Sequence, residues 1–276
     1  MKLYKTKTDI VIEKDDLFYL VQNENWDTFI NDDKLSEKID DLILILKKRN
    51  DVTIEDLLPP IGSNQELWAC GVTYLRSKVG RQEESKASGG ADFYAKVYEA
   101  ERPEVFFKST PHRIVGHNAF VRIRKDSTWD VPEPELTLVV TSSGKIVGYT
   151  IGNDMSSRSI EGENPLYLPQ AKTYDGCAAL GPCVYVTDKP LDVNTMISVE
   201  INRNDQKVFE GSIAISQIKR TLQELVSFVY RECSFPNGCL IMTGTGIVPG
   251  SDFTLKSGDK IKIKIDRIGE LVNTVQ

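Results

Sequence analysis

Alternation of apolar and polar residues dominates the second half of the chain and predicts strands there. Residues 197–202, 207–211 and 260–265 alternate in the manner of strands that bury one face. Residues 136–150 hold two mainly apolar runs on either side of a Ser-Ser-Gly turn, which predicts a β-hairpin. This pattern alone predicts an α+β chain, mainly β.

Helical spacing appears in fewer places. A recurrence of aliphatic residues predicts a long helix over residues 218–232, at positions Leu222, Leu225, Val226 and Val229. Residues 34–48 have an acidic, amphipathic pattern that predicts a surface helix. Residues 84–98 are polar, contain glycine and are compatible with a helix.

Proline and glycine residues near position 60, which interrupt helices and strands, divide the chain into two parts. Strand-like runs at residues 9–12 and 17–21 precede the first predicted helix, and a Pro-Pro-x-Gly-Ser stretch follows at residues 59–63. Proline and glycine clusters of this kind are typical of linkers. We therefore predict a small N-terminal α/β domain, residues 1–63, and a larger catalytic domain, residues 64–276.

Three acidic residues stand at the outer ends of the predicted hairpin. Glu133 and Glu135 flank Pro134 before the first strand, and Asp154 follows the second. Residues two apart in a strand point to the same face, so two carboxylates lie side by side, which is costly without a cation between them. Antiparallel pairing brings Asp154 beside them. Three oxygen ligands suit Mg²⁺, Mn²⁺ or Ca²⁺, whereas Glu-x-Glu by itself is equally compatible with an exposed strand face.

Composition narrows the class of protein. The 276 residues carry a formal net charge of −6, with a pI near 5.2, and show no basic run, which disfavours nucleic-acid or anionic-membrane partners. Neither a signal peptide nor a membrane span is visible. The five cysteines are odd in number and lack metal-type spacing, which is typical of free thiols. We expect a cytoplasmic protein.

A series of short motifs resembles the fumarylacetoacetate hydrolase superfamily in order and spacing over residues 67–276. The motifs are Gly-Val-Thr-Tyr at 71–74, Glu-Val-Phe-Phe-Lys at 104–108, Pro-Glu-Pro-Glu-Leu at 132–136, Asn-Asp-Met-Ser-Ser-Arg at 153–158, Ala-Lys-Thr-Tyr-Asp at 171–175, Thr-Gly-Thr at 243–245 and Leu-Lys-Ser-Gly-Asp at 255–259. The resemblance implies a mixed β-sandwich roll and a homodimer or homotetramer. It also implies that Glu133, Glu135 and Asp154 bind Mg²⁺ and that Lys172 reaches the substrate.

One departure from the superfamily pattern bears on the reaction. Hydrolytic members carry a His-Glu pair on a lid after the Gly-x-x-Tyr segment, and this chain has Ser77 and Gly80 at those positions. The only histidines, His112 and His117, lie far downstream. An imidazole is the natural base for activating water near neutral pH. Its absence argues against hydrolysis of a carbon-carbon bond.

A narrower resemblance is to the branch that dehydrates 2-keto-3-deoxy sugar acids, the arabinonate dehydratases above all. It is carried by Arg-Pro-Glu-Val-Phe-Phe-Lys-Ser-Thr-Pro at 102–111, the loop at 163–172 and Thr-Gly-Thr-Gly-Ile-Val-Pro-Gly at 243–250. It implies a metal-dependent dehydratase that converts an arabinonate- or xylonate-type substrate into 2,5-dioxopentanoate. The alternatives are a carbon-carbon hydrolase or decarboxylase of a related keto acid, and a non-catalytic keto-acid binder.

Under the dehydratase hypothesis, Lys172 is the base at C3, its pKa lowered by the cation and by burial, and Glu104 protonates the departing C4 hydroxyl; the reverse assignment stays open. His117 is interpreted as structural. Further candidates for substrate binding carry a hydroxyl or a charge, or allow a ligand to approach the backbone closely. They are Tyr74, Lys108, Arg158, Gly244 and Thr245.

Overall fold

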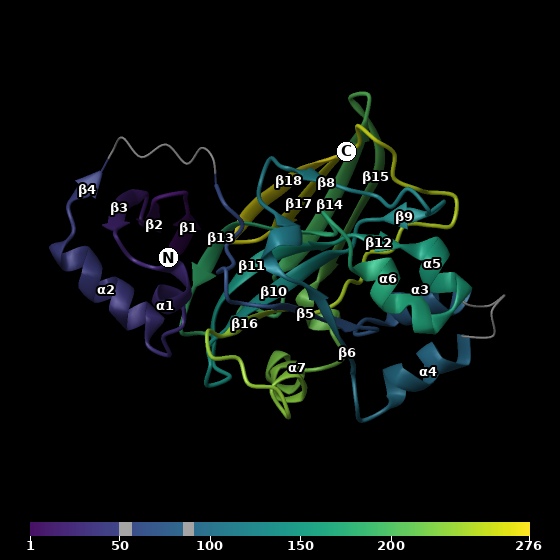
Figure 1. Ribbon diagram of the computed structural model, residues 1–276, viewed down its shortest axis with the longest axis horizontal. Helices are drawn as coiled ribbons and strands as arrows, with labels where there is room; N and C mark the ends of the chain where they lie inside the picture. The colour runs from purple at the N-terminus through teal and green to yellow at the C-terminus, as the bar shows by residue number, and fades with distance from the viewer. Residues whose placement is uncertain (50–56, 85–90) are drawn as a thin grey trace.

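Two β-sheets packed face to face form the body of the computed structural model, which describes residues 1–49, 57–84 and 91–276, without the side chains of residues 83, 84, 91 and 93 (Figure 1). In the described part of the chain, one sheet has eleven strands, the other has five, and β12 and β9 form a short separate ribbon. The mainly β architecture predicted from the alternation is confirmed. No helix of the described residues is long and apolar enough to cross a membrane.

The large sheet runs in the order β4-β3-β2-β1-β13-β11-β10-β16-β5-β6, and β7 also pairs with β13. Its strands are β1 Lys2–Lys5, β2 Asp9–Lys14, β3 Leu17–Gln22, β4 Lys48–Arg49, β5 Leu67–Gly71, β6 Glu104–Ser109, β7 Ile114–Val115, β10 Pro134–Val140, β11 Ile146–Asp154, β13 Ala178–Val186 and β16 Cys239–Met242.

The smaller sheet runs in the order β15-β14-β17-β18-β8. Its strands and the ribbon are β8 Phe120–Val121, β9 Asp130–Val131, β12 Ser156–Ser157, β14 Met196–Arg203, β15 Gln206–Ala214, β17 Lys260–Ile265 and β18 Gly269–Val275. The three alternating segments of the sequence are thus strands β14, β15 and β17, as predicted.

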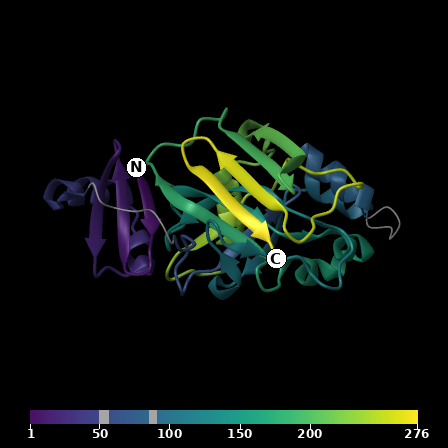
Figure 2. The same cartoon turned by 90° about the horizontal axis from the view of Figure 1, so that it is seen from above.

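The helices are short and lie at the ends and edges of the sheets (Figures 1 and 2). They are α1 Trp26–Ile30, α2 Leu35–Ile45, α3 Leu75–Glu84, α4 Ala91–Glu99, α5 Arg158–Glu163, α6 Leu168–Lys172 and α7 Leu222–Val229, with 3₁₀ turns at Pro111–Arg113, Pro165–Tyr167 and Ile215–Gln217.

The predicted hairpin is the centre of the large sheet. Strand β10 pairs antiparallel with β11, with Glu135 opposite Gly152. The ladder continues one step further, because Glu133 and Asp154 exchange backbone hydrogen bonds of 3.2 and 2.9 Å. All of β10 is buried, since Leu136 and Leu138 enter the core toward the five-stranded sheet while Val139 enters the core on the other face. This two-sided burial fixes the hairpin and hence the position of its acidic ends.

The N-terminal strands extend the large sheet rather than forming a sheet of their own. Lys2 of β1 lies opposite Tyr185 of β13, and the strands predicted at residues 9–12 and 17–21 are found in β2 and β3. Helices α1 and α2 cover this part of the sheet at the left of Figure 1. The helix predicted over residues 34–48 ends at Ile45 and is followed by β4.

Two predicted helices differ from the structure. Helix α7 begins at Leu222 rather than at residue 218, because Thr221 caps it by accepting a hydrogen bond from Glu224 N at 3.1 Å, and it ends at Val229. The helical segment predicted at residues 84–98 corresponds to two helices, α3 and α4, and α3 begins nine residues earlier than predicted, at Leu75. Residues 85–90 lie outside the described residues.

His117 is a structural residue, as predicted, and its protonation should destabilise the fold. Val272 N donates to its Nδ1 over 3.2 Å, and partial burial lowers the pKa of His117 below its ordinary value. The unfolded chain therefore binds this proton more readily. The free energy of unfolding should fall as the pH drops below about 6.5, and this group should have no effect well above that pH.

We expect His117→Gln to remove that part of the acid sensitivity, because glutamine can accept the Val272 hydrogen bond but does not titrate. Urea unfolding of both proteins between about pH 5 and 7.5 measures the difference. Equal slopes of unfolding free energy against pH would contradict this role for His117.

Candidate metal centre and active site

The hairpin ends bring three carboxylates together. Glu133, Glu135 and Asp154 each offer an oxygen, and these oxygens lie within 4.8 Å of one another. All three side chains are buried, with exposed fractions of 4, 2 and 1%. Buried like charges at this spacing repel one another and require compensation. We call this group the carboxylate triad.

The two glutamates of the triad have different surroundings. Glu133 accepts hydrogen bonds of 2.6 Å from both Lys172 Nζ and Arg158 Nη2. Although burial opposes ionisation, these cations lower the pKa of Glu133. Glu135 accepts 2.6 Å from the backbone N–H of Gly244, and no ion pair among the described residues includes it. Burial and the neighbouring Asp154 and Glu133 raise its pKa well above the ordinary range.

This asymmetry is typical of a cation site. Glu135 lies beside two carboxylates and has no ion-pair partner among the described residues, and a divalent ion among the three oxygens would supply one. Carboxylate oxygens are the ligands that Mg²⁺ and Ca²⁺ prefer. The triad therefore fits a hard divalent cation.

Lys172 reaches the triad from the last turn of helix α6, which begins beside Pro169 and leaves the side chain fully buried. Its Nζ donates to Glu133 Oε2 at 2.6 Å, Asp154 Oδ2 at 3.0 Å and Ser156 Oγ at 2.6 Å. Burial lowers the pKa of Lys172, but the nearby carboxylates outweigh it and raise the pKa. The protein's own groups therefore hold Lys172 as an ammonium, which differs from the lowered pKa that we expected.

A fourth buried carboxylate, Glu161 of helix α5, lies behind Lys172. It is 2.5 Å from Arg81 Nη1, 3.5 Å from Lys172 Nζ and 3.7 Å from Arg158 Nη1. These cations lower the pKa of Glu161 against the effect of burial. Arg158 thus pairs with Glu161 and also, at 2.6 Å, with Glu133.

The fully buried charges around the triad are balanced, and the partly buried Glu104 adds one further carboxyl group next to them. Four carboxylates face four cations, and the set is Glu133, Glu135, Asp154 and Glu161 with Arg81, Lys108, Arg158 and Lys172. A divalent cation would therefore leave an excess of positive charge in the cluster. An anionic ligand would offset that excess.

The side chains that helix α3 places over the triad differ from the His-Glu pair of the hydrolases. Ser77 lies in the cavity wall, and its Oγ donates to Tyr74 O at 2.7 Å. Arg81, one turn later, enters the cavity and approaches Glu133 Oε1 to 3.8 Å. No histidine lines this cavity among the described residues. The imidazole that the sequence lacks at residue 77 is therefore not supplied from elsewhere in the described chain.

The cavity itself is small, about 10 Å³, which is room for about one water molecule. Its lining comes from strands β5, β6, β10 and β11, helices α3, α5 and α6, and the loop after β16, and consists of Cys70, Gly71, Val72, Ser77, Arg81, Phe106, Glu133, Glu135, Asp154, Arg158, Lys172, Gly244 and Thr245.

Glu104 stands next to this cavity but is not one of the residues that line it. It begins β6, opposite Gly71 of β5, and a Cβ on Gly71 would lie 1.9 Å from Glu104 Oε2. That oxygen is buried and accepts no hydrogen bond from the described residues. Burial raises the pKa of Glu104 against the lowering effects of Arg81 and Lys172. The other side of Glu104 lines an outer groove with Tyr94 and Val97 of α4.

The remaining predicted residues divide into two groups. Gly244 and Thr245 line the cavity, and Gly244 has φ +91°, where a Cβ would lie 2.1 Å from Thr73 Oγ1. Tyr74 and Lys108 are fully buried and do not line it. Lys108 Nζ lies 2.6 Å from Asp154 Oδ1 and donates to Met155 O, so it supports the triad from behind.

Sequence reasoning missed Arg81, Ser156 and the central position of Glu161. Arg81 directly follows Gly80, one of the two positions that carry the lid dyad in hydrolases. Because the surrounding segment is polar, the charge of Arg81 did not distinguish it from a surface residue. Ser156 belongs to the Asn-Asp-Met-Ser-Ser-Arg motif. The position of Ser156 in that motif, two residues after Asp154, could have indicated that its hydroxyl lies near the triad, where it accepts a hydrogen bond from Lys172.

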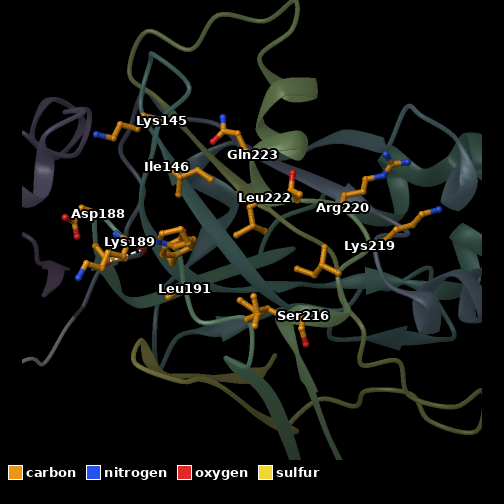
Figure 3. Close-up of a pocket in the computed structure, with 17 residues that line it drawn as sticks. Lys145, Ile146, Asp188, Lys189, Leu191, Ser216, Lys219, Arg220, Leu222 and Gln223 are labelled. Carbon is orange, nitrogen blue, oxygen red and sulfur yellow. Dashed lines mark hydrogen bonds between the residues drawn. The ribbon is translucent and has the colours of Figure 1, made fainter.

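A larger hollow lies away from the triad, between the start of β11, the 187–193 loop and the start of α7 (Figure 3). Ile146, Leu191 and Leu222 gather at its centre, while the charged ends of Lys219 and Arg220 point away from it. Lys219 pairs with Glu99 at 2.9 Å, and Arg220 donates to Glu101 O at 2.8 Å. This hollow therefore borders the end of α4 but offers no polar cluster for catalysis.

The fold and the triad together define a known class. The family model for the fumarylacetoacetate (FAA) hydrolase C-terminal domain matches residues 79–276. The chain belongs to this family.

Similar curated proteins have related names. A "probable 2-keto-3-deoxyxylonate dehydratase" of Haloferax volcanii is 48% identical over 212 residues, which cover 76% of this chain and 72% of that protein. A "2-dehydro-3-deoxy-D-arabinonate dehydratase" of Saccharolobus solfataricus is 42% identical over 229 residues, which cover 82% and 76%.

Solved structures extend the similarity over the whole chain. A 2-keto-3-deoxyarabinonate dehydratase matches with a TM-score of 0.88 and 34% identity, covering 100% of this chain and 99% of that one. A structure of 2-keto-3-deoxy-D-arabinonate dehydratase complexed with magnesium and 2,5-dioxopentanoate matches with a TM-score of 0.86 and 33% identity, with the same coverage. The predicted superfamily fold is confirmed.

The two triad glutamates should respond in opposite ways to neutralisation. Glu133→Gln leaves Arg158 and Lys172 without a shared carboxylate and should lower the free energy of unfolding by about 3–5 kcal/mol, the usual effect of breaking a buried ion pair. Glu135→Gln removes a charge held beside two like charges and should raise the Tm of the chelator-treated protein.

Thermal and urea unfolding in the presence of a chelator measure both effects, with the exposed Glu37→Gln as control. Both triad variants should lose the stabilisation that added Mg²⁺ gives the unmodified protein. Equal destabilisation by the two substitutions would contradict the asymmetry of the triad.

Proposed function

We propose that this protein is a metal-dependent dehydratase of a 2-keto-3-deoxy sugar acid of the arabinonate or xylonate type, with 2,5-dioxopentanoate as product. The observation that carries the proposal is the meeting of Glu133, Glu135, Asp154 and Lys172 in one buried cavity without an imidazole. The dehydratases of similar sequence and structure support the same reaction. The charge balance supports an anionic substrate, since a cation in the triad leaves an excess of positive charge.

The metal is proposed to be Mg²⁺, with Mn²⁺ or Ca²⁺ as substitutes, held by Glu133, Glu135 and Asp154. When bound, it supplies Lewis acidity that makes the C3 protons of a 2-keto acid more acidic. Arg158 and Lys172 hold Glu133 in position for this role, and Lys108 holds Asp154. The Gly244 N–H orients Glu135.

The geometry favours the reverse of the acid and base roles that we first assigned. Lys172 donates hydrogen bonds to three oxygens, so its nitrogen has no lone pair to offer and is suited to protonating a departing hydroxyl. Glu104 has a buried oxygen that accepts no hydrogen bond from the described residues, and so is suited to taking a proton. We therefore propose Glu104 as the base at C3 and Lys172 as the acid at C4.

The proton transfers balance with this pair. Glu104 takes a proton from C3, the C4–O bond breaks, and Lys172 gives the hydroxyl the proton that releases it as water. The resulting C3–C4 alkene is an isomer of 2,5-dioxopentanoate. Transfer of one hydrogen from C5 and one from its hydroxyl to C3 and C4 completes the conversion to the aldehyde.

Turnover of 2-keto-3-deoxy-pentonates tests the proposed function. We expect formation of 2,5-dioxopentanoate with Mg²⁺, loss of turnover with chelator, and a decrease of about 10²-fold or more in kcat for Glu133→Gln and Lys172→Met. Chromatography of the products separates the outcomes. Pyruvate and glycolaldehyde would replace the dehydratase proposal with carbon-carbon cleavage, and tight keto-acid binding without any product would replace it with a binding protein.

Isotope exchange tests the assignment of base and acid. 2-Oxopentanoate has the same carbon chain but no hydroxyl to lose, so exchange of its C3 protons with D₂O reports on the base alone. We expect Lys172→Met to retain this exchange within about threefold and Glu104→Gln to lose it. Proton NMR follows the exchange. The opposite pattern would restore Lys172 as the base.

The organisation of the chain is proposed along the same lines. We propose that residues 1–63 form a small domain whose β1 docks on β13 of the catalytic domain, residues 64–276. We further propose an assembly of identical chains, which light scattering would test, and a cytoplasmic location. The five cysteines are free, which agrees with a reducing compartment.

A further inference from the structure

The lid helix α3 contacts the catalytic core through a buried charge. Arg81, in the last turn of α3, is 4% exposed, and its Nη1 lies 2.5 Å from Glu161 Oε2. Glu161 belongs to α5 and is 1% exposed. A buried ion pair of this kind holds its two elements together, because separating the partners leaves an uncompensated charge in a poorly hydrated site.

The pair is connected to the reacting groups on one side and to the rest of the lid on the other. Glu161 Oε1 lies 3.5 Å from Lys172 Nζ, and Arg81 Nη2 lies 3.8 Å from Glu133 Oε1. The Arg81 guanidinium also lies over the Tyr94 ring of α4, 5.7 Å from its centre. Figure 1 shows α3 close to α5 and α6, the helix that carries Lys172.

Two ion pairs near the surface of the lid are of a different kind. Lys78 of α3 pairs with the exposed Glu99 of α4 at 3.2 Å, and Lys219 pairs with the same carboxylate at 2.9 Å. Exposed pairs contribute little to stability. These contacts join α3 to α4 and α4 to the 219–220 segment, whereas the Arg81–Glu161 pair joins α3 to the wall of the cavity.

We propose that Arg81 is a positioning residue, which acts through Glu161 to hold α3 over the carboxylate triad and to keep Lys172 aligned. The proposal rests on the proposed dehydratase function for its kinetic part only. An arginine fork can meet a carboxylate and an aromatic ring at once, which a lysine cannot do equally well. In a closed site, water is excluded and the ammonium of Lys172 keeps one orientation.

The first test is the movement of the lid, measured by hydrogen–deuterium exchange without substrate. Arg81→Met and Glu161→Gln should each speed amide exchange in residues 75–84 by roughly tenfold or more. Lys78→Met, on the same helix, should change it by less than about twofold. Arg81→Lys should restore part of the protection, and the double variant should add little to either single one. Unchanged exchange in Arg81→Met, or an equal change in Lys78→Met, would overturn the proposal.

The second test separates positioning from general loss of structure. In Arg81→Met, kcat should fall about tenfold or more while KM changes by less than about threefold, because the triad and its metal remain in place. Calorimetry should give a Mg²⁺ affinity within about threefold of the unmodified protein. A large loss of Mg²⁺ affinity would instead assign Arg81 to maintenance of the triad. If the unmodified protein has no dehydratase activity, the proposed function fails, and the exchange and Mg²⁺ measurements still decide the role of the pair.

Discussion

Mutual repulsion of buried carboxylates is the constraint on which the active site depends. Glu133, Glu135 and Asp154 are held within 4.8 Å of one another by the register of one hairpin, and every one of them is buried. Such a group is tolerated only with compensating positive charge. Lys108, Arg158 and Lys172 supply it for Glu133 and Asp154, and Glu135 is left as the position whose charge a metal would balance.

The fold divides the groups of the site between strands and short helices. The triad stands on β10 and β11, at the centre of the large sheet, where packing on both faces leaves little freedom. Three of the four compensating cations come instead from short helices, Arg81 from α3, Arg158 from α5 and Lys172 from α6, and the fourth, Lys108, comes from strand β6. The carboxylate triad is thus positioned by the strands, while most of the cations that compensate its charge are borne by short helices.

Sequence reasoning predicted the parts of the site that local rules determine. Two glutamates two positions apart, and an aspartate at the end of the partner strand, follow from strand periodicity and hairpin pairing alone. Lys172 was predicted only from the resemblance to the family, because no local rule of sequence relates a residue in α6 to strand β10. Arg81 and Glu161 escaped for the same reason: they lie on separate helices, and only tertiary packing brings them together. The predicted start of α7 was four residues too early. Thr221 caps the helix, and this local signal is not part of the hydrophobic periodicity on which the prediction rested.

The replacement of the hydrolases' lid histidine also limits what this lid can do. A histidine can exchange a proton near neutral pH, whereas Ser77 stands at that position here and Arg81, one turn later, stays charged and donates hydrogen bonds only. Helix α3 therefore offers no imidazole to activate water, and under the proposed function the proton transfers are assigned to Lys172 and Glu104. A reaction that expels water suits such a site better than one that must activate it, because no imidazole of the described residues lines the cavity. The same metal-binding hairpin can thus serve different reactions within one family, with the residues of the covering helix deciding which proton transfers are available.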